Sequence, residues 1–124
     1  MIEARFLGQQ GGFRLDADFT VPSQGVTALF GPSGCGKTTV LRCVAGLIRF
    51  EHGKLVIAGE VWQSENCFVP VHLRALGYVF QEASLFPHLS VRGNLEFGQR
   101  RVTERAHMIS LHDVVDLLGI GRLF

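Results

Sequence analysis

The sequence predicts an α/β fold in which short strands and helices surround a glycine-rich loop. Residues Ile2–Leu7 and Phe13–Val21 alternate apolar and polar side chains, and Gly11-Gly12 supplies a turn, so a hairpin is expected. Val26–Phe30 is an almost wholly apolar run bounded by turns, which is typical of a strand buried on both faces. Residues 31–38 then lead into a stretch with helical spacing.

The remaining elements follow from the same periodicities. Lys37–Leu47 spaces its apolar side chains as one face of a helix does. Further strands are expected at Leu55–Ile57, Gly59–Trp62 and Leu76–Phe80. Arg92–Gly98 predicts a short helix, and Thr103–Leu118 predicts a longer one that ends before Gly119. The apolar face of that longer helix would hold Met108, Leu111, Val115 and Leu118.

Composition narrows the class of protein. Hydrophobic residues make up 47% of the 124 residues and charged residues 19%, which excludes a disordered chain. The net charge of +1 gives no reason to expect a nucleic-acid partner. No apolar run approaches the roughly 20 residues that span a bilayer, and the first residues do not resemble a signal peptide. A cytosolic chain is therefore expected.

The cysteines and histidines predict neither a disulfide framework nor a metal site. Cys35, Cys43 and Cys67 are odd in number and lack the CxxC spacing. His107 and His112 are five residues apart, which does not place both on one helical face.

The strongest motif is a phosphate-binding loop that fits G-x-x-x-x-G-K-[ST]. Its residues are Gly31, Pro32, Ser33, Gly34, Cys35, Gly36, Lys37 and Thr38, with Thr39 next in the first helical turn. Glycines let successive backbone N–H groups point inward at a phosphate, and the following helix adds its free N–H groups and positive dipole end. Lys37 is expected to bridge the β- and γ-phosphates of ATP, and the Thr38 hydroxyl to bind Mg²⁺. Cys35 is interpreted as a small filler residue.

The residues around this loop resemble those of the ABC-transporter ATPases. The run GPSGCGKTTVLRCVAGL is similar to the loop and helix of that family, and Gly53–Gly59 to a strand of its antiparallel β-subdomain. GYVFQ followed by LFPHLSV is similar to its Q-loop segment, and Asn94-Leu95 with Phe97-Gly98 to the start of its helical subdomain. The resemblance implies a P-loop NTPase core with an antiparallel β-subdomain. It places the Q-loop near residue 81 and the helical subdomain at about 92–124.

The resemblance also implies roles and partners. Gln81 would reach Mg²⁺ and the attacking water, a role that suits a neutral carboxamide. Residues 83–91 would receive the transmembrane permease subunit; for Leu85, Phe86 and Leu89, interface and core remain alternative interpretations. The intact protein would pair with a second ATPase subunit as a homodimer. It would lie peripherally on the cytoplasmic face of the bacterial inner membrane.

One family feature is missing, the aromatic ring that stacks on adenine. The expected place falls near Gln9 or Gln10, and neither side chain can stack. Phe13 is the nearest aromatic residue, although a strand position favours the core for it, and Phe6 is a weaker candidate.

The family's signature LSGGQ, its catalytic carboxylate and its switch histidine have no match before Phe124. The resemblance therefore predicts a truncated N-terminal part of the ATPase domain, spanning 1–124, which binds ATP without turnover because most of the transition-state stabilisation is lacking. The family's strands that would cover Val26–Phe30 also lie beyond the signature. We therefore expect self-association, unless the first hairpin and the Lys37–Leu47 helix shield that run.

The cargo follows only from resemblance. The string Val91-Arg92-Gly93-Asn94-Leu95, with the preceding motifs, is most similar to ATPase subunits of molybdate importers. A sulfate, iron or polyamine importer is the alternative within the family. Outside it, a small P-loop nucleotide kinase would need a phosphate lid, for which Arg100, Arg101 and Arg105 are the candidates. A non-catalytic nucleotide-binding module is a third interpretation.

Overall fold

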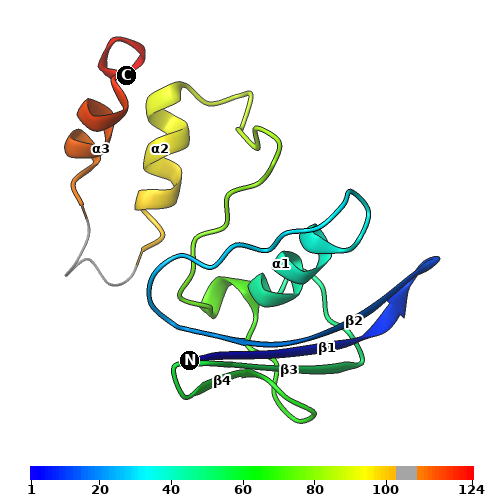
Figure 1. Ribbon diagram of the computed structural model, residues 1–124. Coiled ribbons are helices and arrows are strands. Elements are labelled where there is room, and N and C mark those ends of the chain that lie inside the picture. Colours follow the sequence, from blue (N-terminus) through cyan, green and yellow to red (C-terminus); the bar gives the residue numbers. More distant parts are fainter. Residues whose placement is uncertain (103–108) are drawn as a thin grey trace. The chain divides into compact units, whose positions relative to one another are not determined.

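The computed structural model describes residues 1–102 and 109–124, as a first unit at Met1–Tyr78 and a second at Val79–Phe124 (Figure 1). The first unit is built on a four-stranded antiparallel sheet with the order β2-β1-β3-β4. The strands are β1 (Ile2–Gln10), β2 (Phe13–Val21), β3 (His52–Ile57) and β4 (Glu60–Gln63). The expected first hairpin and the strands expected at Leu55–Ile57 and Gly59–Trp62 are therefore confirmed, with β1 and β3 longer than predicted.

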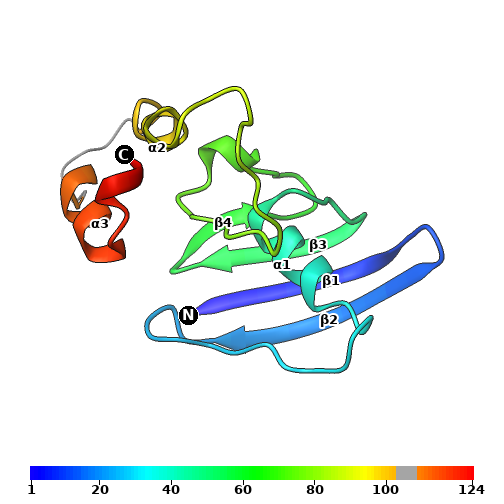
Figure 2. The same ribbon diagram turned by 90° about the horizontal axis from the view of Figure 1, so that it is seen from above.

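Helix α1 (Lys37–Ala45) packs on one face of this sheet (Figures 1 and 2). The strands alternate buried and exposed positions, as their sequence pattern predicted. The core beneath the helix holds Ala4, Phe6, Leu15, Val40, Cys43, Phe50, Leu55 and Trp62. This packing fixes the start of α1, and with it the glycine-rich loop, against the edge strand β2.

The prediction of a strand buried on both faces at Val26–Phe30 is wrong. The segment belongs to no strand, and the side chains of Val26 and Phe30 are each 99% exposed. Apolar character favours burial, but a strand also requires a neighbour for its backbone hydrogen bonds. The sheet formed by the described residues contains only β1 to β4. The hairpin and α1 therefore do not shield this run.

The strand predicted at Leu76–Phe80 is also absent. The chain passes through a short 3-10 turn, η1 (Val71–Leu73), and continues without regular structure. Val79 is exposed, although Leu76 packs against the core of the first unit. The physical reason is the same as for Val26–Phe30, since the sheet of the described residues consists of β1 to β4 and includes neither run.

The second unit contains α2 (Val91–Gln99), α3 (Leu111–Leu118) and a final 3-10 turn, η2 (Gly121–Leu123). In the described part of the predicted long helix, α3 begins at Leu111 after Ser110, which is extended and whose hydroxyl accepts a hydrogen bond from Asp113 N–H as an N-cap. Val115 is buried as predicted, but Leu118 is 63% exposed. The predicted positions from Thr103 to Met108 lie outside the described residues. No helix among the described residues is long and apolar enough to cross a membrane.

Candidate nucleotide-binding site

The glycine-rich loop closes on itself through short-range contacts. The N–H of Cys35 donates to the Pro32 carbonyl at 3.3 Å, which forms a turn. Gly34 and Gly36 have φ values of 81° and 102°, a region that side chains other than glycine rarely enter. A Cβ placed on Gly31 would lie 2.7 Å from Cys35 Sγ, so the thiol fills the space left by that glycine. This agrees with the interpretation of Cys35 as a filler residue.

The amine of Lys37 lies over the loop. Lys37 Nζ donates to the carbonyl oxygens of Gly31 at 2.6 Å and Pro32 at 2.8 Å, and lies 3.7 Å from Cys35 Sγ. Lys37 is half-buried, and within the described residues both carbonyl partners of its amine are neutral backbone groups. The arrangement can exchange these carbonyls for phosphate oxygens, which are stronger acceptors because they are charged.

The first turn of α1 provides the second part of the cradle. Its N-cap is Gly36, which supplies no side-chain hydrogen bond, and its first turn has no acidic residue. The first N–H groups of a helix have no partner within the helix, so an anion at this end is stabilised by them and by the helix dipole. Thr38 is exposed and Thr39 half-buried in this turn. The hydroxyl of Thr38 is the kind of oxygen ligand that Mg²⁺ takes beside phosphate.

The loop is held against the sheet by a close approach at Gly36. A Cβ on this residue would lie 2.8 Å from Phe13 Cζ and 3.3 Å from Leu15 Cδ1, both on β2. Phe13 is half-buried and packs against the core, as its strand position predicted. The loop therefore requires glycine at residue 36 for its backbone angle and for space.

A buried arginine, which the sequence analysis did not single out, holds the other end of α1. Arg74 Nη1 donates to the carbonyls of Val44 at 2.7 Å and Cys43 at 3.3 Å, and Arg74 Nε donates to the Val69 carbonyl at 2.8 Å. Its positive charge also lies at the negative end of the helix dipole. Burial lowers the pKa of Arg74, and it raises the pKa of the Cys43 thiol to about 11, against the opposing effect of Arg74. A signal existed in the sequence, since Arg74 stands within an apolar stretch.

The adenine-stacking residue is not identified. Phe6 is 0% exposed within the core, so the weaker candidate is wrong. Gln9 and Gln10 are exposed at the end of β1, and Gln9 Nε2 donates to the Gly11 carbonyl at 3.4 Å.

Gln81 belongs to the second unit, where its side chain is exposed and lies outside any helix or strand. The phosphate loop and Gln81 therefore belong to different units of the chain. In the same unit, Leu85 is 70% exposed and Leu89 is half-buried. Phe86 is 39% exposed, and the centroid of its ring lies 4.4 Å from that of the Phe97 ring. Leu85 is thus not a core residue of the described unit, whereas Phe86 and Leu89 contribute to its packing.

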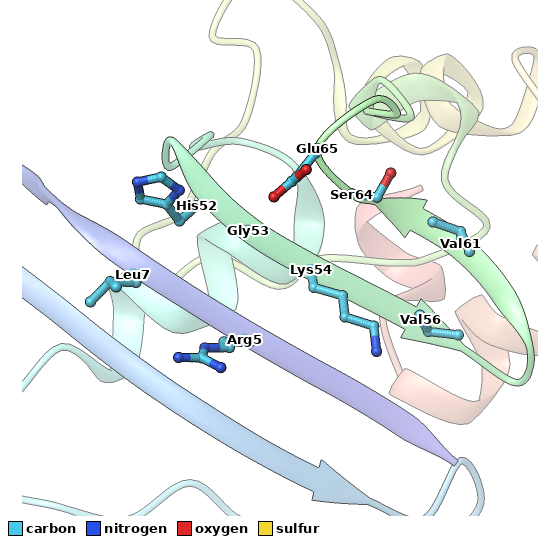
Figure 3. A pocket seen from close by; sticks show the side chains of 9 residues that line it. All are labelled: Arg5, Leu7, His52, Gly53, Lys54, Val56, Val61, Ser64 and Glu65. Atoms are coloured by element: carbon cyan, nitrogen blue, oxygen red, sulfur yellow. The ribbon is translucent and has the colours of Figure 1, made fainter.

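A separate cavity of about 550 Å³ lies on the sheet face opposite α1 (Figure 3). Leu7, Val56 and Val61 line it with charged groups of both signs from Arg5, Lys54 and Glu65, and Lys54 pairs with Glu3 at 3.3 Å. None of the predicted site residues lines it. Such a solvated face with mixed charge is common for an antiparallel sheet. Among the described residues, no group of three His, Cys, Asp or Glu side chains could hold a metal ion.

Comparison with known proteins decides the family. The family model described as "ABC transporter" matches residues 15–122. The chain belongs to the ABC transporter family. The α/β class and the family predicted from the motifs are thus confirmed, and the phosphate loop and helix α1 of this ABC transporter chain lie within the matched range.

Named relatives within this family match almost the whole chain at high sequence identity. The chain is 63% identical over 122 residues to the molybdenum import ATP-binding protein ModC of Thiobacillus denitrificans, covering 98% of the chain and 34% of that protein. It is 63% identical over 123 residues to the protein of the same name from Rhodobacter capsulatus, covering 99% of the chain and 34% of the relative. For ModC 1 of Azotobacter vinelandii the identity is 60% over 124 residues, with 98% and 34% covered. The ABC transporter chain therefore spans about a third of the length of these relatives.

Proposed function

We propose that the chain is the nucleotide-binding part of an ATPase subunit that drives molybdate import. The observation that supports this most directly is the loop at residues 31–38, with its left-handed glycines and the Lys37 amine drawn over it. The names of the relatives, all molybdenum import ATP-binding proteins at 60–63% identity in the three cases above, support the cargo. Importers of sulfate, iron or polyamine are the alternatives that transport measurements would separate.

In this proposal the loop binds the phosphates of ATP. The backbone N–H groups of the loop and of the first turn of α1 contact the phosphate oxygens, and Lys37 neutralises charge between the β- and γ-phosphates. Thr38 provides an oxygen ligand for Mg²⁺, and Gln81 a second ligand that also orients water. Bound Mg²⁺ neutralises phosphate charge, while Lys37 and the loop hold the nucleotide in place.

The proposed partners are a permease and a second ATPase subunit. Residues 83–91 are the proposed permease-docking segment, and the exposure of Leu85 supports a contact with another chain. The ATPase subunit would lie on the cytoplasmic face of the inner membrane, held there by the permease. The exposed apolar run at Val26–Phe30 supports association of the isolated chain with itself.

Calorimetric titration of the chain with ATP in the presence of Mg²⁺ tests the nucleotide site. We expect saturable binding of one ATP per chain and, because the signature and catalytic carboxylate have no match here, no hydrolysis above background. An absence of binding at millimolar ATP would overturn the proposed site. Hydrolysis at the rate of an intact transporter subunit would show that residues 1–124 already contain the catalytic residues, which contradicts the proposal.

The kinase alternative makes a different prediction, which is phosphoryl transfer from ATP to a nucleoside monophosphate. Two of its candidate lid arginines have other partners in the second unit. Arg100 pairs with Glu96 at 3.1 Å, and the guanidinium of Arg101 lies 3.5 Å from the centroid of the Phe97 ring. Arg105 lies outside the described residues. Formation of a nucleoside diphosphate from labelled ATP and a monophosphate acceptor would replace the transporter proposal.

A further inference from the structure

A single carboxamide holds the segment that precedes α2. Asn94 Oδ1 accepts a hydrogen bond from the Phe86 N–H at 2.7 Å. Asn94 Nδ2 lies within donating distance of the carbonyl oxygens of Ser90 at 2.9 Å, Phe86 at 3.1 Å and Leu89 at 3.2 Å. The side chain therefore binds both backbone groups of Phe86 and the last two carbonyls before the helix. The turn it encloses is closed by the Leu89 N–H, which donates to the Phe86 carbonyl at 3.1 Å.

The chemistry of these contacts requires an amide at residue 94. One contact needs an acceptor, and the other three carbonyls share the two N–H donors of Nδ2; only the carboxamides of Asn and Gln combine an acceptor oxygen with two N–H donors on one planar group. The contacts also fix the orientation of the amide, since the reverse orientation would face its oxygen toward three carbonyls. Aspartate has nearly the same shape but no donor, so it would repel the same carbonyls.

The ring of Phe86 adds a second attachment to the same helix. It lies 4.4 Å from the Phe97 ring and 5.8 Å from the His88 ring, measured between centroids. On the Phe97 ring lies the guanidinium of Arg101, which also donates to the Phe97 carbonyl at 2.8 Å. Backbone and ring contacts together attach Phe86 to α2, while Leu85 beside it stays 70% exposed. The segment is thus fixed to α2 and presents an apolar side chain to solvent.

We propose that Asn94 is a positioning residue for permease docking: its carboxamide holds residues 85–90 on α2 in the conformation that the permease binds. This inference rests on the proposed docking function of residues 83–91. A segment ordered before binding loses less conformational entropy on association than a free loop does, so the clamp increases affinity without touching the partner. It also makes the segment and α2 move together.

The first arm of the test measures the clamp without any permease. Asn94→Asp is compared with wild type, and Glu96→Gln on the same helix is the control, because the contacts of the Glu96 carboxylate are exposed ion pairs with Arg92 and Arg100. Hydrogen exchange followed by mass spectrometry should show faster exchange for residues 85–90 only in Asn94→Asp, with α1 and α3 unchanged. Equal exchange at residues 85–90 in all three proteins overturns the clamp.

The second arm measures docking with the 124-residue chain and the permease subunit of a molybdenum importer in lipid nanodiscs. Asn94→Asp should bind about tenfold more weakly than wild type, the scale of one or two net hydrogen bonds, while Glu96→Gln and ATP binding stay unchanged. Equal affinity of wild type and Asn94→Asp overturns the inference but leaves the docking proposal standing. Absence of wild-type binding overturns the docking proposal, and the positioning role fails with it. Faster exchange in α3 of Asn94→Asp would mean general unfolding of the unit and would also overturn the positioning role.

Discussion

The phosphate loop at residues 31–38 directly follows the apolar run Val26–Phe30. The loop adopts the structure that its sequence predicts, and the run does not. The loop at residues 31–38 is closed by contacts between residues no more than six apart, such as Lys37 to Gly31 and Cys35 to Pro32. Val26–Phe30 forms no strand and is exposed along its whole length. The loop depends on local backbone geometry, whereas a buried strand depends on partners from elsewhere in the chain. A structure held by contacts between residues near each other in the sequence is therefore predicted more reliably than a strand that needs distant partners.

The largest expected difference concerns two cysteines on either side of the start of α1. Cys35 is exposed in the loop, whereas Cys43 is buried and its pKa is raised to about 11, so at pH 8 only about a thousandth of Cys43 is thiolate. A maleimide should therefore modify Cys35 and not Cys43, and it should abolish ATP binding because the adduct fills the cradle. Modification of Cys43 should begin only as the pH approaches 11. Mass spectrometry of digested protein, with and without prior ATP, checks both statements; lack of protection of Cys35 by ATP would contradict the site.

The next largest effect is expected for Gly36→Ala, with Gly34→Ala as its matched control. Both residues have positive φ, which costs a side chain about 1–2 kcal/mol. Only at Gly36 would the new Cβ meet Phe13, at 2.8 Å, so the total cost should reach about 3 kcal/mol of unfolding free energy. Denaturant unfolding of both variants measures the difference. Equal destabilisation would mean that Phe13 does not support the loop.

Removing the loop cation should affect binding rather than stability. Lys37→Ala should weaken ATP affinity by about 2 kcal/mol, roughly thirtyfold, because charged hydrogen bonds to phosphate are lost. Lys54→Ala is the control, since Lys54 is an exposed cation on the opposite sheet face, paired with Glu3. Calorimetry with Mg²⁺ present compares the three proteins. Similar affinities for Lys37→Ala and wild type would remove the loop from the nucleotide site.

The smallest expected effect concerns self-association of the chain through the apolar run Val26–Phe30. The isolated chain should self-associate, and Phe30→Ser should weaken that association by roughly 1 kcal/mol, about fivefold in dissociation constant, by removing apolar surface. Leu73→Ser is a control at another exposed apolar residue of the same unit. Light scattering across a dilution series gives both constants. A stable wild-type monomer at micromolar concentration would contradict this prediction.

The sequence predicted well those elements that depend on periodicity along one short stretch. The hairpin of β1 and β2, helix α1 and helix α2 fall in this class, because each shows its amphipathic pattern over its own length. The sequence failed at Leu76–Phe80 for the reason given for Val26–Phe30. It also missed the N-cap at Ser110 inside the predicted long helix, although serine before an apolar stretch is a common helix start.

The residues of the candidate site also fall into two groups, those predicted from a local motif and those that only the structure revealed. Lys37, the glycines and Thr38 follow from the motif alone, since their spacing fixes the geometry. The apolar stretch around Arg74 could have indicated its burial, but its partners could not be assigned from sequence, because they are carbonyl oxygens about 30 residues away in α1. Gln81 was assigned only by resemblance, and its role stays a prediction. The four contacts of Asn94 likewise needed a structure, because backbone acceptors leave no trace in the sequence.

The contact of Arg74 with Trp62 means that tryptophan fluorescence can report on the last turn of α1. Trp62 is the only tryptophan in the sequence, its side chain is buried, and its ring centroid lies 5.7 Å from the guanidinium carbon that serves the last turn of α1. Indole emission responds to the charge and solvent around the ring, so its wavelength reports whether the far end of the loop helix is in place. Unfolding of the first unit should shift the emission to the red without any added dye.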